Sequence, residues 1–269
     1  MSTAETAQAR AYDNNGQYSR KSILRYEKIF GDGYISTGGP GTTDYLCKTL
    51  GSALRPGLRV LDVGSGIGGA AIHLARTYGA DVVGLDLAPE MVQIALERAS
   101  ELDSDGPGAV AFILGDILEE SFAHPFDLIW SRDALMHIPD KPRLFARLFD
   151  LLDDGGQIII TDYARGEGTT TPEFAEYVRK TGYHLVSPSQ YGRLLEGAGF
   201  VDVEVEDATA RFVEIMRTEA AHLAADRAGF LEVFSEDDLN YLIDRWAMKE
   251  QFCAAGDMKW GIYRAFKRS

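Results

Sequence analysis

A glycine-rich run at residues 62–69, DVGSGIGG, is the first segment of this sequence that could do chemistry. It follows a short apolar stretch and precedes a segment with helical spacing, which predicts a loop between a strand and a helix. Glycines in such a loop let the backbone turn tightly and approach a ligand. The run also matches G-x-G-x-x-G, a weak signature of dinucleotide sites. Asp62 argues against a dinucleotide at this site, because its carboxylate would repel the pyrophosphate of a dinucleotide. The same carboxylate would attract a ligand that carries an ammonium or a sulfonium.

Two further acidic residues come at the ends of the next two predicted strands. Asp86 lies twenty residues after Gly66, and Asp116 directly follows Gly115. A carboxylate at the end of the second strand binds ribose hydroxyls in dinucleotide folds. An acid after the third strand suits the exocyclic amine of adenine. The loop and the two acids therefore predict a nucleoside-containing ligand.

Together these features resemble the class I methyltransferases that depend on S-adenosylmethionine. The resemblance implies that Gly64 approaches the methionine part of that cofactor and Asp86 its ribose. It also implies that Asp116 and Ile117 contact the adenine. Two alternatives to a methyltransferase stay open at this point. The glycines serve only a tight turn, or the protein is a nicotinamide-dependent enzyme.

A second run, SRDALMHIPD at residues 131–140, follows the fourth predicted strand. Asp133 and His137 are four residues apart, so on a helical turn they would share a face. A histidine that titrates near neutral pH is a suitable base for an amine, and a carboxylate would hold the ammonium form. Alternatively, His137 only caps or packs the turn, and Arg132 with Asp133 is a surface ion pair.

The N-terminal arm makes the resemblance narrower. The sequence resembles the phosphoethanolamine N-methyltransferases, in particular their small single-domain form. The resemblance extends from about Gln17 to the last predicted strand. Five runs carry it: QY with RYEKIFGDGYISTGG, LDVGSGIGG, WSRDALMHI, ITDY and EYVRKTGY. The arm is predicted to be a lid that excludes water from the site. The alternative is that the aromatic residues of the arm only pack against the rest of the protein and contact no ligand.

The resemblance assigns roles to individual residues. Tyr18 and His137 match a tyrosine–histidine latch that deprotonates the amine, and Asp133 matches an acid near the substrate nitrogen. The expected cofactor contacts are Gln17, Ile35, Ser36, Asp62, Gly64, Gly66, Asp86, Leu87, Asp116, Ile117 and Arg132. The expected contacts around the substrate phosphate are Tyr26, Tyr163, Tyr183 and Lys249.

One position departs from the family pattern. The family has an arginine two residues before the tyrosine that matches Tyr183, whereas this sequence has Thr181. Guanidinium groups are the strongest side-chain clamps for phosphate, and a threonine offers one uncharged hydroxyl. Arg179 would share a helical face with Tyr183 and could compensate; otherwise the substrate is not a phosphomonoester.

The elements that must position these residues alternate along the chain. Short apolar strands separated by helical segments predict an α/β fold, a doubly wound, mostly parallel seven-stranded sheet with an α-helical lid. We expect a helical arm and lid over 1–54 and a cofactor-binding core over 55–163. Residues 164–269 are expected to hold a lid insertion, the remaining core strands and the C-terminal helices. We expect all three segments to form a single domain overall.

Composition excludes several classes of protein. The 269 residues carry 27 Lys plus Arg against 41 Asp plus Glu, a net charge of −14, which disfavours nucleic-acid binding. No apolar run is long enough for a membrane span, and no leader peptide is recognisable. The two cysteines, Cys47 and Cys253, predict neither a disulfide framework nor a zinc site. We expect a cytoplasmic monomer that needs no metal.

These observations predict a methyltransferase for a small polar amine, with methylation of phosphoethanolamine towards phosphocholine as the leading function. The alternative substrate is an amino-acid-like zwitterion, methylated on sulfur as in methionine or on nitrogen as in glycine, because Thr181 replaces the arginine. A cofactor-binding protein without catalytic activity is the remaining hypothesis.

Overall fold

The computed structural model describes residues 19–101 and 106–268, and the chain divides into two compact units, residues 1–120 and 121–269. Seven strands build a single, mostly parallel sheet with helices packed on it. This confirms the predicted α/β class with its seven-stranded sheet. The predicted segment boundaries and the single domain stay predictions.

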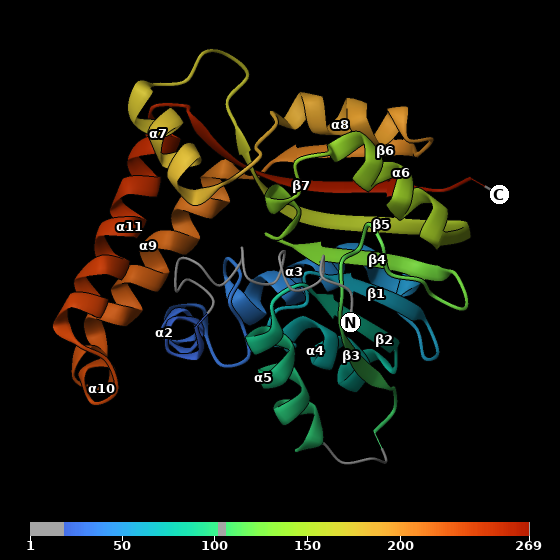
Figure 1. The fold of residues 1–269 in the computed structure, drawn as a ribbon, viewed down its shortest axis with the longest axis horizontal. Helices are drawn as coiled ribbons and strands as arrows, with labels where there is room; N and C mark the ends of the chain where they lie inside the picture. The colour runs from blue at the N-terminus through green and yellow to red at the C-terminus, as the bar shows by residue number, and fades with distance from the viewer. Residues whose placement is uncertain (1–18, 102–105, 269) are drawn as a thin grey trace, which may run out of the picture. The chain divides into compact units, whose positions relative to one another are not determined.

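The first unit contributes three parallel strands in the spatial order β3-β2-β1 (Figure 1). Its elements are α2 (Arg20–Phe30), α3 (Gly39–Leu50), the short 3-10 turn η1 (Gly51–Ala53), β1 (Arg59–Val63), α4 (Gly69–Tyr78), β2 (Asp81–Asp86), α5 (Pro89–Ser100) and β3 (Val110–Leu114). Helices α4 and α5 both pack on β2 and β3. Strand β1 is almost entirely buried, as expected of a parallel strand covered on both faces.

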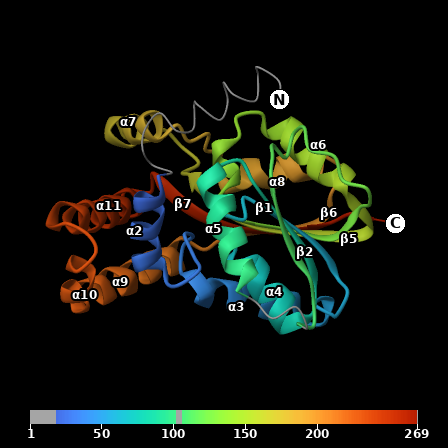
Figure 2. The same ribbon diagram turned by 60° about the horizontal axis from the view of Figure 1, so that its bottom comes forward.

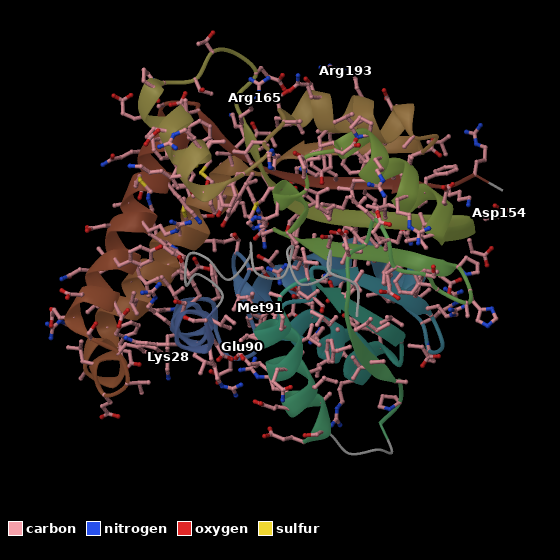
Figure 3. All side chains as sticks on the ribbon, viewed as in Figure 1. Lys28, Glu90, Met91, Asp154, Arg165 and Arg193 are labelled. Atoms are coloured by element: carbon pink, nitrogen blue, oxygen red, sulfur yellow. The ribbon has the colours of Figure 1, made fainter. Side chains whose placement is uncertain are left out.

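Helix α2, the described part of the N-terminal arm, packs against α5 in the same unit. Ile23 lies in a buried apolar cluster with Met91 and Ile94; Met91 is labelled in Figure 3. The carboxylate of Glu27 accepts hydrogen bonds from the Gly33 backbone N–H and the Arg98 guanidinium, both at 2.6 Å. The arm is therefore attached to the unit that carries the glycine loop.

The second unit contributes four strands in the order β4-β5-β7-β6. Its elements are β4 (Phe126–Arg132), the 3-10 turn η2 (Leu135–His137), α6 (Lys141–Leu151), β5 (Leu152–Arg165), α7 (Pro172–Thr181), α8 (Pro188–Gly197), β6 (Val201–Asp207), α9 (Thr209–Ala225), α10 (Arg227–Leu231), α11 (Glu236–Ala254) and β7 (Met258–Phe266). Strands β4 and β5 are parallel, and β7 runs antiparallel to both β5 and β6.

Two groups of helices cover the strands of this unit. Helix α8 packs on β6 and β7 and contacts α6, while α9 and α11 lie side by side against β7 (Figure 2). The three isoleucines Ile158–Ile160 of β5 and the indole of Trp130 in β4 are completely buried. Helix α11 begins at a capping box, because Ser235 and Asp238 bond each other's backbone N–H groups. This helix carries one of the predicted substrate residues, Lys249.

Three elements differ from what the sequence pattern predicts. The pattern predicts a helix over residues 42–54, whereas the structure has α3, which starts earlier and is followed by η1 up to Ala53. The pattern also predicts one helix over residues 211–234, whereas the structure has two, because the chain turns at Asp226 between α9 and α10. The helical turn expected to hold residue 133 begins only at Leu135. Within the described part of the chain, no helix is both long and apolar enough for a membrane crossing.

Candidate active site

The glycine loop after β1 has the conformation that its sequence requires. Gly64, Gly66 and Gly68 have φ values of 74°, 54° and 90°, which other residues rarely adopt. The N–H of Gly64 donates to the carbonyl of Leu85 at 2.8 Å, which fixes the loop at the end of β2. A Cβ at Gly66 would lie 3.0 Å from the side chain of Ile35, so this position needs the space as well as the dihedral angle.

Asp86 holds the same loop from the end of β2. Its two carboxylate oxygens accept the backbone N–H groups of Gly66 at 2.8 Å and Ala88 at 2.9 Å. Burial raises the pKa of Asp86, and these backbone hydrogen bonds partly offset the rise. Each oxygen has a second lone pair, so the carboxylate can still accept a hydroxyl of a ligand. The twenty-residue spacing thus reflects a direct contact between loop and acid.

The remaining predicted cofactor residues of the first unit lie around this loop and at the end of β3. Asp62 is buried at the end of β1, and Ile117 is buried next to Asp116. The carboxylate of Asp116 accepts the Leu118 N–H at 2.9 Å, which holds the turn after β3. Ser36 accepts the Gly39 N–H at 3.0 Å through its carbonyl, just before α3. Leu87 directly follows Asp86 in the sequence.

These residues fit S-adenosylmethionine. The buried hydroxyl of Ser65 has no hydrogen-bond partner among the described residues, so a ligand could provide one. At Gly66 the absence of a side chain keeps the backbone open to a ligand, whereas a Cβ there would clash with Ile35. Gln17 and Tyr18 lie outside the described residues, so their predicted contacts stay predictions. No group of three or more His, Cys, Asp or Glu in the described part of the chain is placed to hold a metal ion.

In the second unit, Asp133 follows β4 with an unusual backbone. Its φ is 50°, in the left-handed region that a non-glycine residue adopts only when its surroundings hold it there. Its N–H donates to the carbonyl of Thr161 at 2.7 Å. Its Oδ1 accepts the Thr161 hydroxyl at 3.1 Å and the Trp260 indole N–H at 2.8 Å. Since Arg132 before it is buried at the end of β4, the two residues are not a surface ion pair.

His137 is the last residue of η2, and its ring packs edge-on against Tyr183 at a centroid distance of 5.2 Å. The prediction that Asp133 and His137 share a helical face is wrong, because residue 133 is left-handed and the 3-10 turn begins two residues later. Burial, together with the positive charges of Lys141 and His184, lowers the pKa of His137 to about 4. The imidazole is therefore neutral at neutral pH and able to accept a proton.

The buried Lys141, which was not predicted from the sequence, supports this turn. Its ammonium donates to the carbonyls of Leu135 and Ile138, both at 2.7 Å, on either side of His137. Burial lowers the pKa of Lys141, and the negative charge of Asp162, completely buried at the carboxyl end of β5, opposes that fall. Burial raises the pKa of Asp162 to about 7, while Lys141 opposes that rise. The sequence feature that could have identified Asp162 is an acidic residue at the end of an otherwise apolar strand.

The predicted phosphate residues of the second unit form one cluster. The ammonium of Lys249, on α11, donates to the Tyr163 hydroxyl at 2.9 Å and lies 4.5 Å from the centre of that ring. Tyr163 and Tyr183 are both buried, with centroids 6.1 Å apart. Burial, together with the positive charge of the nearby Arg245, lowers the pKa of Lys249 to about 7. Tyr26 belongs to α2 of the first unit, where it stacks on Phe30.

The structure does not bring Arg179 and Thr181 into this cluster. Helix α7 ends at Thr181, and Gly182 reverses the chain, so Tyr183 is not on the same helical face as Arg179. The Arg179 side chain is 71% exposed and forms a salt bridge with Glu176 at 2.7 Å. The Thr181 hydroxyl donates to the carbonyl of Tyr177 at 2.9 Å. The alternative that Arg179 compensates for the missing arginine therefore stays a prediction without support from these contacts.

Comparison with known proteins agrees with this geometry. Residues 54–199 match a family model described as a methyltransferase domain. The chain is 39% identical to phosphoethanolamine N-methyltransferase 1 of Zea mays, over 99% of this chain and 52% of that protein. It is 33% identical to the phosphoethanolamine N-methyltransferase of Plasmodium falciparum, over 94% of both chains.

Solved structures give the same result. Phosphoethanolamine N-methyltransferase 2 of Haemonchus contortus, in complex with phosphomonomethylethanolamine and S-adenosylhomocysteine, matches with a TM-score of 0.92 and 35% identity. The match covers 97% of this chain and 60% of that one. The chain thus spans about half the length of the plant relatives it matches. With a methyltransferase domain over residues 54–199 and a Plasmodium relative similar along nearly its whole length, the chain belongs to the phosphoethanolamine N-methyltransferase family.

Proposed function

We propose that this protein uses S-adenosylmethionine to methylate the nitrogen of phosphoethanolamine and of its partly methylated forms. One observation carries the proposal, a continuous series of contacts in the second unit. It runs from the neutral imidazole of His137 through Tyr183 and Tyr163 to the ammonium of Lys249. A group that accepts a proton and a group that attracts an anion are thereby joined through two rings. This arrangement suits a compact substrate with an amine at one end and a phosphate at the other.

The relatives support both ligands. The Haemonchus protein binds phosphomonomethylethanolamine and S-adenosylhomocysteine, the product of a methyl transfer. In this chain the glycine loop, Asp86 and Asp116 would hold the cofactor, which supplies a methyl group on a positively charged sulfur. The direct transfer of that methyl group to nitrogen needs alignment of the two atoms and exclusion of water rather than a covalent enzyme intermediate.

The residues of the second unit have separate tasks in this proposal. Asp133, oriented by Thr161 and Trp260, attracts the ammonium form of the substrate. The neutral His137 accepts the proton that the nitrogen must lose before it can attack. Because its pKa is low, His137 passes that proton on rather than keeping it. Tyr18 is its predicted partner in this step.

A release assay for S-adenosylhomocysteine tests the proposed function. The acceptors are phosphoethanolamine, its monomethyl and dimethyl forms, ethanolamine, glycine, dimethylglycine and methionine. We expect turnover on the phosphorylated amines and at least 100-fold lower kcat/KM for ethanolamine, which lacks the phosphate. Turnover on methionine or dimethylglycine without turnover on any phosphorylated amine would contradict the proposal. The predicted monomer is tested by sedimentation of the same preparation.

A further inference from the structure

Helix α11 places two cationic side chains one turn apart, Arg245 and Lys249. Residues four apart on a helix are neighbours on one face, so the two positive charges lie close together. The effect is visible in the lowered pKa of Lys249, for which Arg245 is the main cause after burial. Like charges so placed repel each other in the ligand-free protein. Asp133 and Glu219 oppose part of this repulsion, and an anion bound between or beside the two cations would oppose it further.

Arg245 lies near three tyrosines, of which Tyr183 belongs to the cluster described above. Its guanidinium carbon lies 5.7 Å from the ring centre of Tyr177 and 6.0 Å from that of Tyr241. One guanidinium nitrogen donates to the Tyr241 hydroxyl at 3.4 Å. Arg245 also interacts with the hydroxyl of Tyr183, where it opposes the rise in pKa that burial causes. Tyr183 in turn contacts Tyr163, the residue that Lys249 bonds.

The position of Arg245 answers the question left by Thr181. Helix α7 contributes no guanidinium to the cluster, since Thr181 bonds its own helix and Arg179 is engaged with Glu176 in solvent. Arg245 reaches the same Tyr183 from a different element, α11. A planar guanidinium has several donors and suits the oxygens of a phosphate. The charge that is missing from α7 is thus available from α11.

We propose that Arg245 and Lys249 of α11 together bind the phosphate of the acceptor and set the specificity of the enzyme for a phosphomonoester. This inference rests on the proposed function. Two adjacent cations match a dianion better than a single carboxylate, so the pair selects a phosphorylated amine over an amino acid. Arg245 is a substrate-binding residue in this proposal and takes no part in the proton transfer.

The test compares Arg245→Gln with the wild-type protein in steady-state kinetics. We expect KM for phosphoethanolamine to rise about 10- to 100-fold, as for the loss of a hydrogen-bonded charge, with kcat within about threefold. Competitive inhibition by inorganic phosphate should weaken by a similar factor. Binding of S-adenosylhomocysteine, measured by calorimetry, should stay within about twofold. Arg245→Lys keeps the positive charge, so its KM for phosphoethanolamine should lie between those of the wild-type protein and Arg245→Gln.

Two matched variants make the result decisive. Arg217→Gln removes an exposed arginine of α9 that pairs with Glu250, and should behave as wild type. Arg179→Gln represents the rival arrangement, in which α7 supplies the charge. If Arg179→Gln raises KM and Arg245→Gln does not, the inference is wrong.

The inference and the proposed function fail in different ways. If Arg245→Gln weakens cofactor binding and kcat as much as it raises KM, Arg245 has a structural role and the inference is overturned. Thermal unfolding of each variant identifies a loss of folding. If wild type methylates phosphoethanolamine while Arg245→Gln has an unchanged KM, only the inference fails. If wild type methylates no phosphorylated amine, the proposed function fails too.

Discussion

The two units of this protein position their functional groups by different means. In the first unit, backbone geometry dominates: three left-handed glycines make a loop that Asp86 holds through the backbone N–H of Gly66. In the second unit, buried charged side chains dominate, namely Lys141, which donates to the carbonyls of Leu135 and Ile138, and Lys249, which donates to Tyr163. A ligand site built from backbone tolerates side-chain changes around it, whereas one built from buried charges depends on each partner.

The largest effect is expected at His137, and it tests whether the two units act separately. His137→Ala should lower kcat for phosphoethanolamine by about 10²- to 10⁴-fold, the usual contribution of a positioned base. The affinity for S-adenosylhomocysteine should stay within several-fold, because the glycine loop lies in the first unit. Calorimetry with the same preparation checks this. Equal loss of cofactor binding would show that His137 is structural.

Lys141→Met tests how far the second unit depends on its buried ammonium. The change leaves the carbonyls of Leu135 and Ile138 without their charged donor, and should destabilise the protein by about 3 kcal/mol. Lys180→Met is the control, since Lys180 forms an exposed pair with Glu176 and should cost less than about 1 kcal/mol. Urea unfolding measures both. Equal midpoints for the two variants would rule out a supporting role for Lys141.

Gly66→Ala tests the backbone-built site. An alanine there meets Ile35 and a φ of 54°, so we expect S-adenosylhomocysteine binding to weaken about 10- to 100-fold, the effect of about 1–3 kcal/mol. Gly57→Ala is a matched control, because Gly57 has a φ of 72° and nothing within 4 Å of its would-be Cβ. That variant should lose some stability and no cofactor affinity. If both variants bind the cofactor equally well, the loop geometry is not what binding requires.

The smallest effect expected is a pH dependence of substrate binding through Lys249. Its pKa is about 7 in the folded protein and 10.5 in the unfolded chain, so the folded state binds fewer protons between these values. The stability of the ligand-free protein should therefore rise with pH over that window. Anion binding needs the protonated lysine, so KM for phosphoethanolamine should increase above pH 7, by at most about tenfold per pH unit.

Lys249→Arg provides the control for this dependence. Arginine does not lose its proton in the accessible pH range, so the rise of KM above pH 7 should disappear in the variant. A variant with the same profile as wild type would assign the dependence to another group. Arg245, Asp133, Glu219 and Cys253 are the charged or titratable neighbours of Lys249 to consider.

The difference between the units also explains what could be predicted from the sequence. The glycine loop and Asp86 are close together in the chain and obey a spacing rule, so the loop after β1 and the acid at the end of β2 could be placed from the sequence. The central strands β1, β4 and β5 could be predicted because they are mostly buried and rich in apolar residues. Arg245 and Lys141 were not identified, because a lone cation on a helix is usually exposed. Only tertiary packing shows that these two are directed inward.

Local conformation was the other source of error. Asp133 and His137 were expected on one helical turn from their spacing alone. Hydrogen bonds from Thr161 and Trp260, residues far along the chain, hold Asp133 in a left-handed conformation instead. Likewise, Arg179 and Tyr183 were expected on one face, but α7 stops at Gly182 between them. Spacing rules apply only while the helix continues.

The hydrogen bond between Trp260 and Asp133 has a consequence for biosynthesis. The two residues are 127 positions apart, and Trp260 belongs to β7, which inserts between β5 and β6. During synthesis, β4, β5 and the turn with His137 leave the ribosome before Trp260 is translated. Thr161 can then already bond the carboxylate of Asp133, whereas the second hydrogen bond, from the indole of Trp260, becomes available only with β7. A pause in translation before residue 258 should therefore leave a chain in which Asp133 has the first of these hydrogen bonds and lacks the second.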